Sequence, residues 1–221
     1  MVDIFDEVDA ELKAERAQKL LVKYGVWLLL AALLVVAGTA AWQVREWYQA
    51  RYDRATAGIY LDAMFAAEAQ GKIGNMPAAT VAADDFARVI HRGPDSYRTL
   101  ARLQQAALEA KQGHEAAAAA MWNAVAEDGN ADPLLRDLAV LLWTEHQLGT
   151  GNPQLLRERL APLLKAGNPW RPLAQEAEAL LDMRQGQTTQ AKKLLEGLAM
   201  DITAPLGLRE RAGALLQRLN G

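Results

Sequence analysis

Two stretches of the chain share one pattern: residues 113–125 read GHEAAAAAMWNAV and residues 186–198 read GQTTQAKKLLEGL. In each stretch an alanine follows a glycine by five residues, a large apolar residue lies four further on, and another apolar residue lies three beyond that. The residues concerned are Ala118, Trp122 and Val125, and Ala191, Leu195 and Leu198. Positions with this spacing share one face of an α-helix. The pattern therefore predicts a helix with an apolar stripe in each stretch.

The glycines that open these stretches belong to a longer series. Gly71, Gly113, Gly149 and Gly186 are 42, 36 and 37 residues apart, a period typical of helix-hairpin repeats. The same apolar spacing follows the other two glycines, at Ala82, Phe86 and Val89 and at Leu156, Leu160 and Leu163. One hairpin cannot bury its stripe alone, so successive hairpins are expected to stack. We predict an all-α fold in which residues 45–221 form an α-solenoid of about four hairpins, with a capping helix from Leu206 to Leu219.

The composition supports helices and excludes several functions. Alanine and leucine, which are strong helix formers, supply much of an apolar content of 51%. The net charge is -3 and no run of lysine and arginine exceeds two, so the basic surface that nucleic-acid binding needs is missing. Cysteine is absent, which excludes disulfides and thiolate zinc sites but says nothing about the compartment.

An uncharged segment of 21 residues, from Tyr24 to Val44, precedes the repeats. As a helix it would cover roughly 30 Å, the thickness of the hydrocarbon core of a bilayer. Aromatic residues lie near both ends, where they would rest at the headgroup levels. The residues that we assign to the span include Tyr24, Trp27, Leu30, Leu34, Trp42 and Val44. The segment predicts one membrane-spanning helix over residues 24–44, because the alternative, a buried core helix, rarely lacks every charge.

A cleaved signal peptide is a second alternative, because Gly38, Thr39, Ala40 and Ala41 resemble a cleavage site. We expect the segment to be retained, since residues 1–23 carry six acids where a signal peptide begins with a short basic region. Four basic residues precede the span within the leader and three follow it by residue 54. This weak positive-inside bias predicts that residues 1–23 are cytoplasmic and that the larger domain is periplasmic. The acids at the start of the leader and the bases at its end predict that residues 1–23 form a short helix.

Residue types that serve catalysis are scarce. Ser96 is the only serine in the sequence, and its place after a Gly-Pro-Asp turn predicts a helix N-cap. His91, His114 and His146 are 23 and 32 residues apart, so a metal site would need a tertiary coincidence. We expect no catalytic residue, no metal site, no cofactor and no small-molecule substrate, with a membrane-tethered hydrolase as the alternative from a different class.

The joint Asn168-Pro169-Trp170-Arg171 holds the residues best suited to a binding surface. Tryptophan and arginine are over-represented in binding hot spots, and a ring at a joint between hairpins is open to solvent when nothing covers it. Trp170 and Arg171 are therefore candidate protein-binding residues. The alternative is that Trp170 fastens the fourth hairpin to the third.

The glycine, alanine and apolar positions that follow Gly113 and Gly186 resemble the second half of a tetratricopeptide repeat. The first half departs from that pattern. Its leading aromatic position falls on Tyr60, Arg102, Leu138 and Gln175, of which only the first is aromatic. The resemblance implies degenerate repeats whose concave face binds extended or helical segments of other proteins.

A leader beginning Val2-Asp3-Ile4-Phe5, one span, a Trp-rich exit and the joint at Trp170 together resemble the ancillary SecYEG translocon subunit family, particularly its alphaproteobacterial members. The resemblance implies a non-enzymatic protein of the bacterial inner (plasma) membrane, with the Sec translocon and periplasmic chaperones as partners and newly exported chains as clients. Residues and spacing alone are equally compatible with an adaptor for envelope assembly or cell division that does not contact the translocon.

Overall fold

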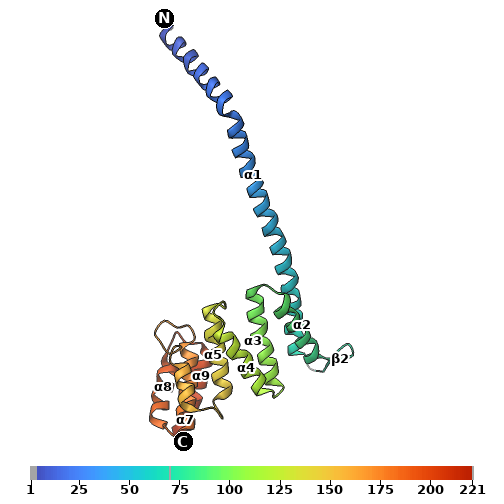
Figure 1. Ribbon diagram of the computed structural model, residues 1–221. Coiled ribbons are helices and arrows are strands. Elements are labelled where there is room, and N and C mark those ends of the chain that lie inside the picture. Colours follow the sequence, from blue (N-terminus) through green and yellow to red (C-terminus); the bar gives the residue numbers. More distant parts are fainter. Residues whose placement is uncertain (1–3, 70, 221) are drawn as a thin grey trace. The chain divides into compact units, whose positions relative to one another are not determined.

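The computed structural model describes residues 4–69 and 71–220. These residues form nine α-helices and one β-hairpin (Figure 1). The helices are α1 (Ile4–Glu68), α2 (Ala78–Arg92), α3 (Asp95–Lys111), α4 (Glu115–Glu127), α5 (Pro133–Gln147), α6 (Pro153–Leu160), α7 (Arg171–Arg184), α8 (Thr188–Met200) and α9 (Leu206–Asn220). The expected all-α class is confirmed, apart from the short strands β1 (Lys72–Ile73) and β2 (Met76–Pro77), which the sequence did not predict.

The chain divides into two compact units, residues 1–54 and 55–221, which we describe separately. Helix α1 runs through the first unit and supplies the first helix of the second. The expected leader and the expected span both lie on α1, except residues 1–3, which are outside the described residues. In the first unit the side chains are described from Trp27 onward, without Leu28 and Gln49.

The helices of the second unit end at the glycine and proline joints of the sequence. Gly113 follows α3 with a φ of 81° and Gly186 follows α7 with a φ of 75°, a conformation that glycine adopts without a Cβ penalty. The Gly113 amide donates to the Ala110 carbonyl at 3.0 Å, and the Gly186 amide donates to the Met183 carbonyl at 3.1 Å. At both joints the next amide reaches one carbonyl further back, at 2.9 and 2.8 Å. Both helices therefore end in the same Schellman motif.

Aspartates end the second helices of these two hairpins in matching conformations. Asp128 after α4 has φ −73° and ψ 102°, and Asp201 after α8 has φ −74° and ψ 103°. Each carboxylate accepts a hydrogen bond from the amide two residues later, at 3.0 Å for Asn130 and 2.8 Å for Thr203. The hairpins α3–α4 and α7–α8 are thus two copies of one structure.

The hairpin between them, α5–α6, departs from this pattern. Its glycine, Gly149, is not among the glycines with positive φ, and α6 has only 8 residues and ends at Leu160. Pro162 has no N–H to continue the ladder of backbone hydrogen bonds. Leu163, which we expected on the same helix as Leu156 and Leu160, lies in the following turn and is nevertheless 1% exposed. The prediction that Leu163 belongs to the same helix as Leu156 and Leu160 is wrong.

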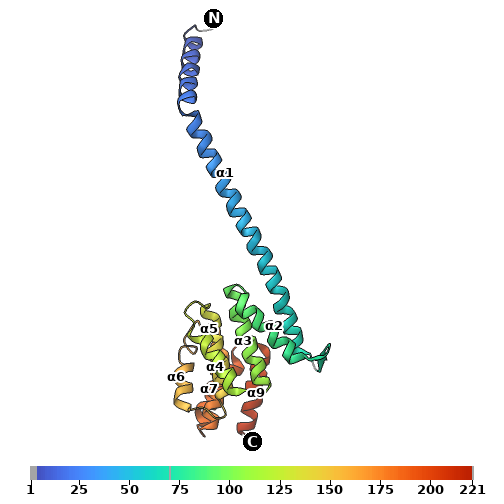
Figure 2. The same ribbon diagram turned by 45° about the vertical axis from the view of Figure 1, so that its right-hand side comes forward.

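The helices pack in sequence order and form two layers. Each helix from α2 to α9 contacts the next, and α3, α5, α7 and α9 also contact one another in turn. Helices α3, α5, α7 and α9 therefore form one layer, which we call the odd-numbered layer, and α2, α4, α6 and α8, which pack against these helices, form the other (Figures 1 and 2). Four clusters of buried apolar residues lie between the layers, each made of neighbouring helices and the turns that join them.

The start of α3 differs from the expectation. Its N-cap position is Pro94 and Ser96 lies inside the first turn, so the prediction of a serine cap is wrong. Proline has no N–H and a fixed φ, which suits the start of a helix, and Asp95 supplies a carboxylate at the positive end of the helix dipole.

Candidate functional site

The apolar segment of α1 is exposed along its described length. Trp27, Leu34 and Trp42 are 71%, 71% and 68% exposed, and Leu30 and Val44 are also exposed. The side chain of Tyr24 lies outside the described residues. Among the helices that the structure describes, α1 alone is long and apolar enough to cross a membrane. A helix of this kind near the N-terminus is consistent with a single-pass anchor or with a signal sequence.

The eight residues that we assigned to repeat packing are all buried. They are Ala82, Phe86, Ala118, Trp122, Leu156, Leu160, Ala191 and Leu195, each with 0% exposure. Among their large side chains, Phe86, Trp122, Leu160 and Leu195 each belong to one of the four buried clusters. Such full burial makes these positions part of the core and leaves them no surface for a partner.

Trp170 is held within its joint. Its indole Nε1 donates to the Leu134 carbonyl at 2.9 Å, and its ring packs on the buried cluster that contains Leu141 and Leu160. The amide of Trp170 donates to Asn168, whose own side-chain amide donates to Asp137 on α5 at 2.8 Å. Trp170 therefore fastens α7 to α5, whereas its neighbour Arg171 is exposed.

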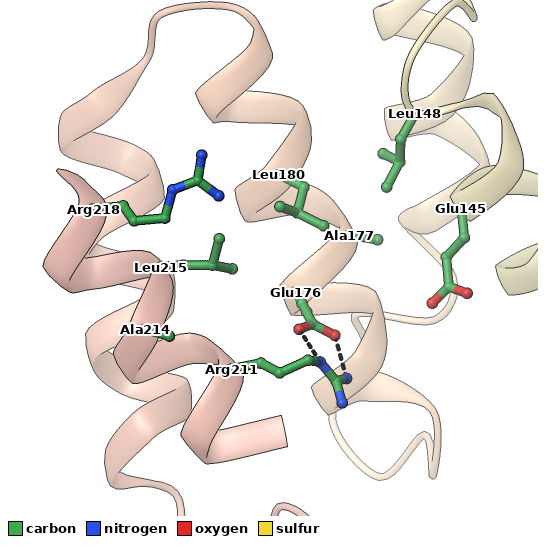
Figure 3. A pocket seen from close by; sticks show the side chains of 9 residues that line it. All are labelled: Glu145, Leu148, Glu176, Ala177, Leu180, Arg211, Ala214, Leu215 and Arg218. Carbon is green, nitrogen blue, oxygen red and sulfur yellow. Dashed lines mark hydrogen bonds and ion pairs between the residues drawn. The ribbon is translucent and has the colours of Figure 1, made fainter. Parts of the chain in front are cut away.

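A groove of about 520 Å³ lies across the odd-numbered layer, on helices α5, α7 and α9 (Figure 3). The residues that define this α5–α7–α9 groove are Glu145 and Leu148, then Glu176, Ala177 and Leu180, then Arg211, Ala214, Leu215 and Arg218. The leucines Leu148, Leu180 and Leu215 are half-buried and cross the three segments in a row. In the view of Figure 3 the charged residues Glu145, Glu176 and Arg211 form a second row below them.

Glu176 and Arg211 in the groove form an ion pair with each other. Arg211 Nε and Nη2 donate to the two carboxylate oxygens of Glu176 at 2.8 and 2.7 Å, and Glu176 is buried. This bidentate arrangement is the strongest geometry for an arginine and a carboxylate. Hydrogen bonding to Glu176 raises the pKa of Arg211 above its ordinary value. The pair therefore offers little free charge to a partner.

Glu145 and Arg218 in the groove form no such pair with any described residue. Burial raises the pKa of the Glu145 carboxyl, and the nearby Glu176 carboxylate adds to the rise, although His146 and Arg211 oppose it. Part of the Glu145 side chain still reaches solvent. Arg218 is exposed and forms no ion pair within the described part of the chain. The groove thus combines an apolar row with one unpaired acid and one unpaired base.

A second hollow, of about 480 Å³, lies where α3 begins and α4 ends, and it is polar. Its charges are paired with one another: Arg98 with Asp95, and Arg102 with Asp128 at 3.2 Å. Because these groups already have partners, this hollow is a weaker candidate for a binding site than the groove.

Each of the three histidines has different surroundings in the structure. His91 is exposed in the last turn of α2, His114 contacts Glu109 at 2.8 Å, and His146 stacks on Trp122 with ring centroids 4.5 Å apart. Across the described residues no group of three or more histidine or acidic side chains could hold a metal ion.

Sequence reasoning missed the α5–α7–α9 groove. Its residues come from three distant parts of the chain, since Glu145, Glu176 and Arg211 are 31 and 35 residues apart, and no local motif joins them. One signal was present in or directly after each of α5, α7 and α9: a charged residue precedes a leucine by three or four positions, at Glu145 and Leu148, Glu176 and Leu180, and Arg211 and Leu215. Aligning these three segments would have found both rows.

Comparison with known proteins adds no family to this description, since no protein-family model, curated protein or solved structure matches the chain.

Proposed function

We propose that this chain is a membrane-anchored scaffold that binds other proteins, with residues 24–44 as its anchor and residues 45–221 as a tetratricopeptide-like domain. The observation that carries the proposal is the α5–α7–α9 groove, in which half-buried leucines and two unpaired charges lie open on the odd-numbered layer. Apolar surface that stays open beside polar groups is typical of surfaces that bind proteins.

The anchor follows from the same reasoning about exposed apolar surface. The side chains of α1 from Leu29 to Val36 are uncovered and carry no charge. In water this surface would be costly at ~25 cal/mol per Å², and a bilayer removes that cost. The acids of residues 1–23 are atypical of a signal peptide, which favours retention of the segment. We place the N-terminus in the cytoplasm and the domain in the periplasm of a bacterial inner membrane.

The partner that the sequence resemblance suggests is the Sec translocon, with periplasmic chaperones and newly exported chains as further contacts. The chain would act there as an ancillary subunit and not as an enzyme. Its function would be to hold proteins beside a membrane complex, and no cofactor or metal would take part.

Photo-crosslinking in intact cells tests the identity of the partner. A photoreactive residue is placed in turn at the exposed Arg171 and at Leu180 and Ala214 in the groove, and the adducts are identified by mass spectrometry. Adducts with SecY or with periplasmic chaperones support the proposal and its topology. Adducts with cytoplasmic proteins alone contradict the topology, and adducts with envelope or division proteins replace the translocon by an envelope-assembly role.

A further inference from the structure

We propose that the α5–α7–α9 groove binds a partner segment of mixed charge, with apolar side chains over the leucine row, a basic residue beside Glu145 and an acidic residue beside Arg218. This inference rests on the proposed function, because it specifies which kind of segment the scaffold holds.

The leucine row sets the apolar part of the segment. Leu180 and Leu215 lie on α7 and α9, Leu148 directly follows α5, and all three are half-buried. Ala177 and Ala214 lie beside them with small side chains, so the floor is open enough for side chains of a partner to enter. Covering half-exposed leucines with apolar groups removes that surface from water, which is the main driving force of association.

The length of the row indicates a peptide and not a single side chain. Helices that pack side by side have axes about 8–10 Å apart, so a row across three helices is roughly 16–20 Å long. An extended chain advances about 3.3 Å per residue, so a segment of about six residues crosses the row. Alternate side chains of such a segment point to one side and can face the leucines.

The charges at the two ends set the polarity of the segment. Glu176 is satisfied by Arg211 at both carboxylate oxygens, which leaves Glu145 on α5 and Arg218 on α9 without a partner among the described residues. Arg218 is seven residues beyond Arg211 on the same face of α9, about 10 Å further along the helix. In Figure 3 Arg218 lies near Leu215 at one end of the row and Glu145 lies near Leu148 at the other end.

A segment that carries both signs satisfies both open groups, whereas a segment with a single sign meets one like charge. Like charges that face each other across an interface oppose binding, and complementary charges fix the orientation of the partner. Glu145 and Arg218 are both exposed, so each can pair with a charged residue of the partner.

Short peptides test this selectivity on the full chain in phosphatidylcholine nanodiscs. Four fluorescent peptides share an apolar centre of leucine and alanine and have capped termini. Two of them carry one lysine and one aspartate at the ends, in the two possible orders; the third carries two aspartates and the fourth two lysines. Anisotropy titrations are corrected with empty nanodiscs. We expect one mixed-charge peptide to bind about fivefold more tightly than either single-sign peptide.

Charge reversal should change this preference in opposite directions. Arg218→Glu makes the two-lysine peptide the tightest binder, and Glu145→Lys makes the two-aspartate peptide the tightest. Lys193→Glu and Glu196→Lys reverse exposed charges on α8, outside the groove, and serve as matched controls that leave the order unchanged. Both groove residues reach solvent, so these variants are expected to fold; circular dichroism checks it.

Absence of peptide binding, equal affinity for the four peptides, or a preference that neither reversal alters would overturn the inference. The proposed function has a separate test in the cellular crosslinks, which do not depend on the charge of any peptide. Crosslinks to partners without charge selection in the groove would therefore reject the inference and leave the proposed function standing.

Discussion

The hairpins α7–α8 and α5–α6 are neighbours in the chain, but only the first follows the geometry shared with α3–α4. In α7–α8 a glycine in the left-handed region ends the first helix and an aspartate ends the second. In α5–α6 the corresponding glycine lacks that conformation, and the second helix is 8 residues long instead of 13. The glycine and aspartate helix ends thus accompany the regular hairpin geometry, whereas Pro162 accompanies a short second helix.

The irregular hairpin is nevertheless fastened to the regular one. Arg157 on α6 bonds to Asp182 on α7 at 2.7 Å and to Gln187 at 2.7 Å, and Trp170 bonds back to α5. These contacts between residues far apart in the chain hold α5–α6 in position, although it lacks the turns found in the regular hairpins. The comparison shows that the buried apolar positions preserve the stacking of the hairpins. The turns between helices can differ where side chains link neighbouring hairpins.

The largest expected effect is at the equivalent alanines of the two regular hairpins. Ala118→Asp and Ala191→Asp each bury an unpaired carboxylate at a position with 0% exposure, which costs about 3 kcal/mol or more. Thermal unfolding of the full chain in detergent measures the loss. Ala120→Asp, on the exposed side of α4, is the control and changes stability little. An unchanged melting temperature for Ala118→Asp would contradict the repeat register.

A smaller loss is expected when the link between α6 and α7 is cut. Arg157→Ala leaves the carboxylate of Asp182, which is 5% exposed, without its charged partner. Breaking such a pair costs about 2 kcal/mol here, because Arg157 is itself partly solvated. Chemical denaturation measures the change. Arg159→Ala is the control, because it removes only the stacking on Trp143 at 4.4 Å, and similar losses for the two variants would show that the Asp182 contact does not matter.

Replacing glycine by alanine should have different effects on stability in the two kinds of turn. Gly186→Ala forces a Cβ into a φ of 75° and is expected to cost about 1 kcal/mol, as is Gly113→Ala. Gly149→Ala has no such strain and no atom within 4 Å of the added Cβ, so it is neutral or slightly stabilising. Melting temperatures of the three variants check the contrast, and a loss for Gly149→Ala as large as the others would refute it.

The smallest effect concerns Glu145 in the groove and its dependence on pH. Its folded pKa is raised, so the ionised form is disfavoured in the folded state at neutral pH. Glu145→Gln is expected to raise stability at pH 7 by only a few tenths of a kcal/mol, because Glu145 is exposed and solvent screens its charge. The gain should shrink as pH falls through the raised pKa, because native Glu145 then takes up a proton, and vanish below the ordinary pKa of a glutamate, where the unfolded chain is protonated too. Melting curves between pH 4.5 and 7.5 measure it, with Glu196→Gln as control; a gain that grows toward acid would have the wrong sign.

Features of the structure that depend on residues close together in the chain could be predicted from the sequence, and features that depend on distant residues could not. The joints at Gly113 and Gly186 were predictable because a left-handed helix end has one preferred residue, and the packing positions were predictable from spacing along one helix. The end of α6 was missed because Pro162 was outweighed by an apolar spacing that continues to Leu163. The hairpin of β1 and β2 is too short to carry an alternating pattern.

The candidate site was less accessible to sequence reasoning. Trp170 was chosen for its residue type, but its bond to Leu134 joins residues 36 positions apart, and no local pattern encodes that contact. The leucine row depends on how α5, α7 and α9 pack, and Glu145 and Arg218 are unpaired only because Glu176 and Arg211 pair with each other. Such properties follow from tertiary packing.

The most direct test of the membrane-anchored scaffold compares two faces of the same domain in living cells. A photoreactive residue at Leu180 in the groove is compared with one at Lys193 on α8, and adducts from the membrane fraction are analysed for partner peptides and for peptides of residues 1–23. We predict abundant adducts at Leu180, few at Lys193, and retained leader peptides in both. Equal yields at the two positions, or adducts that have lost the leader and leave the membrane fraction, would contradict the account.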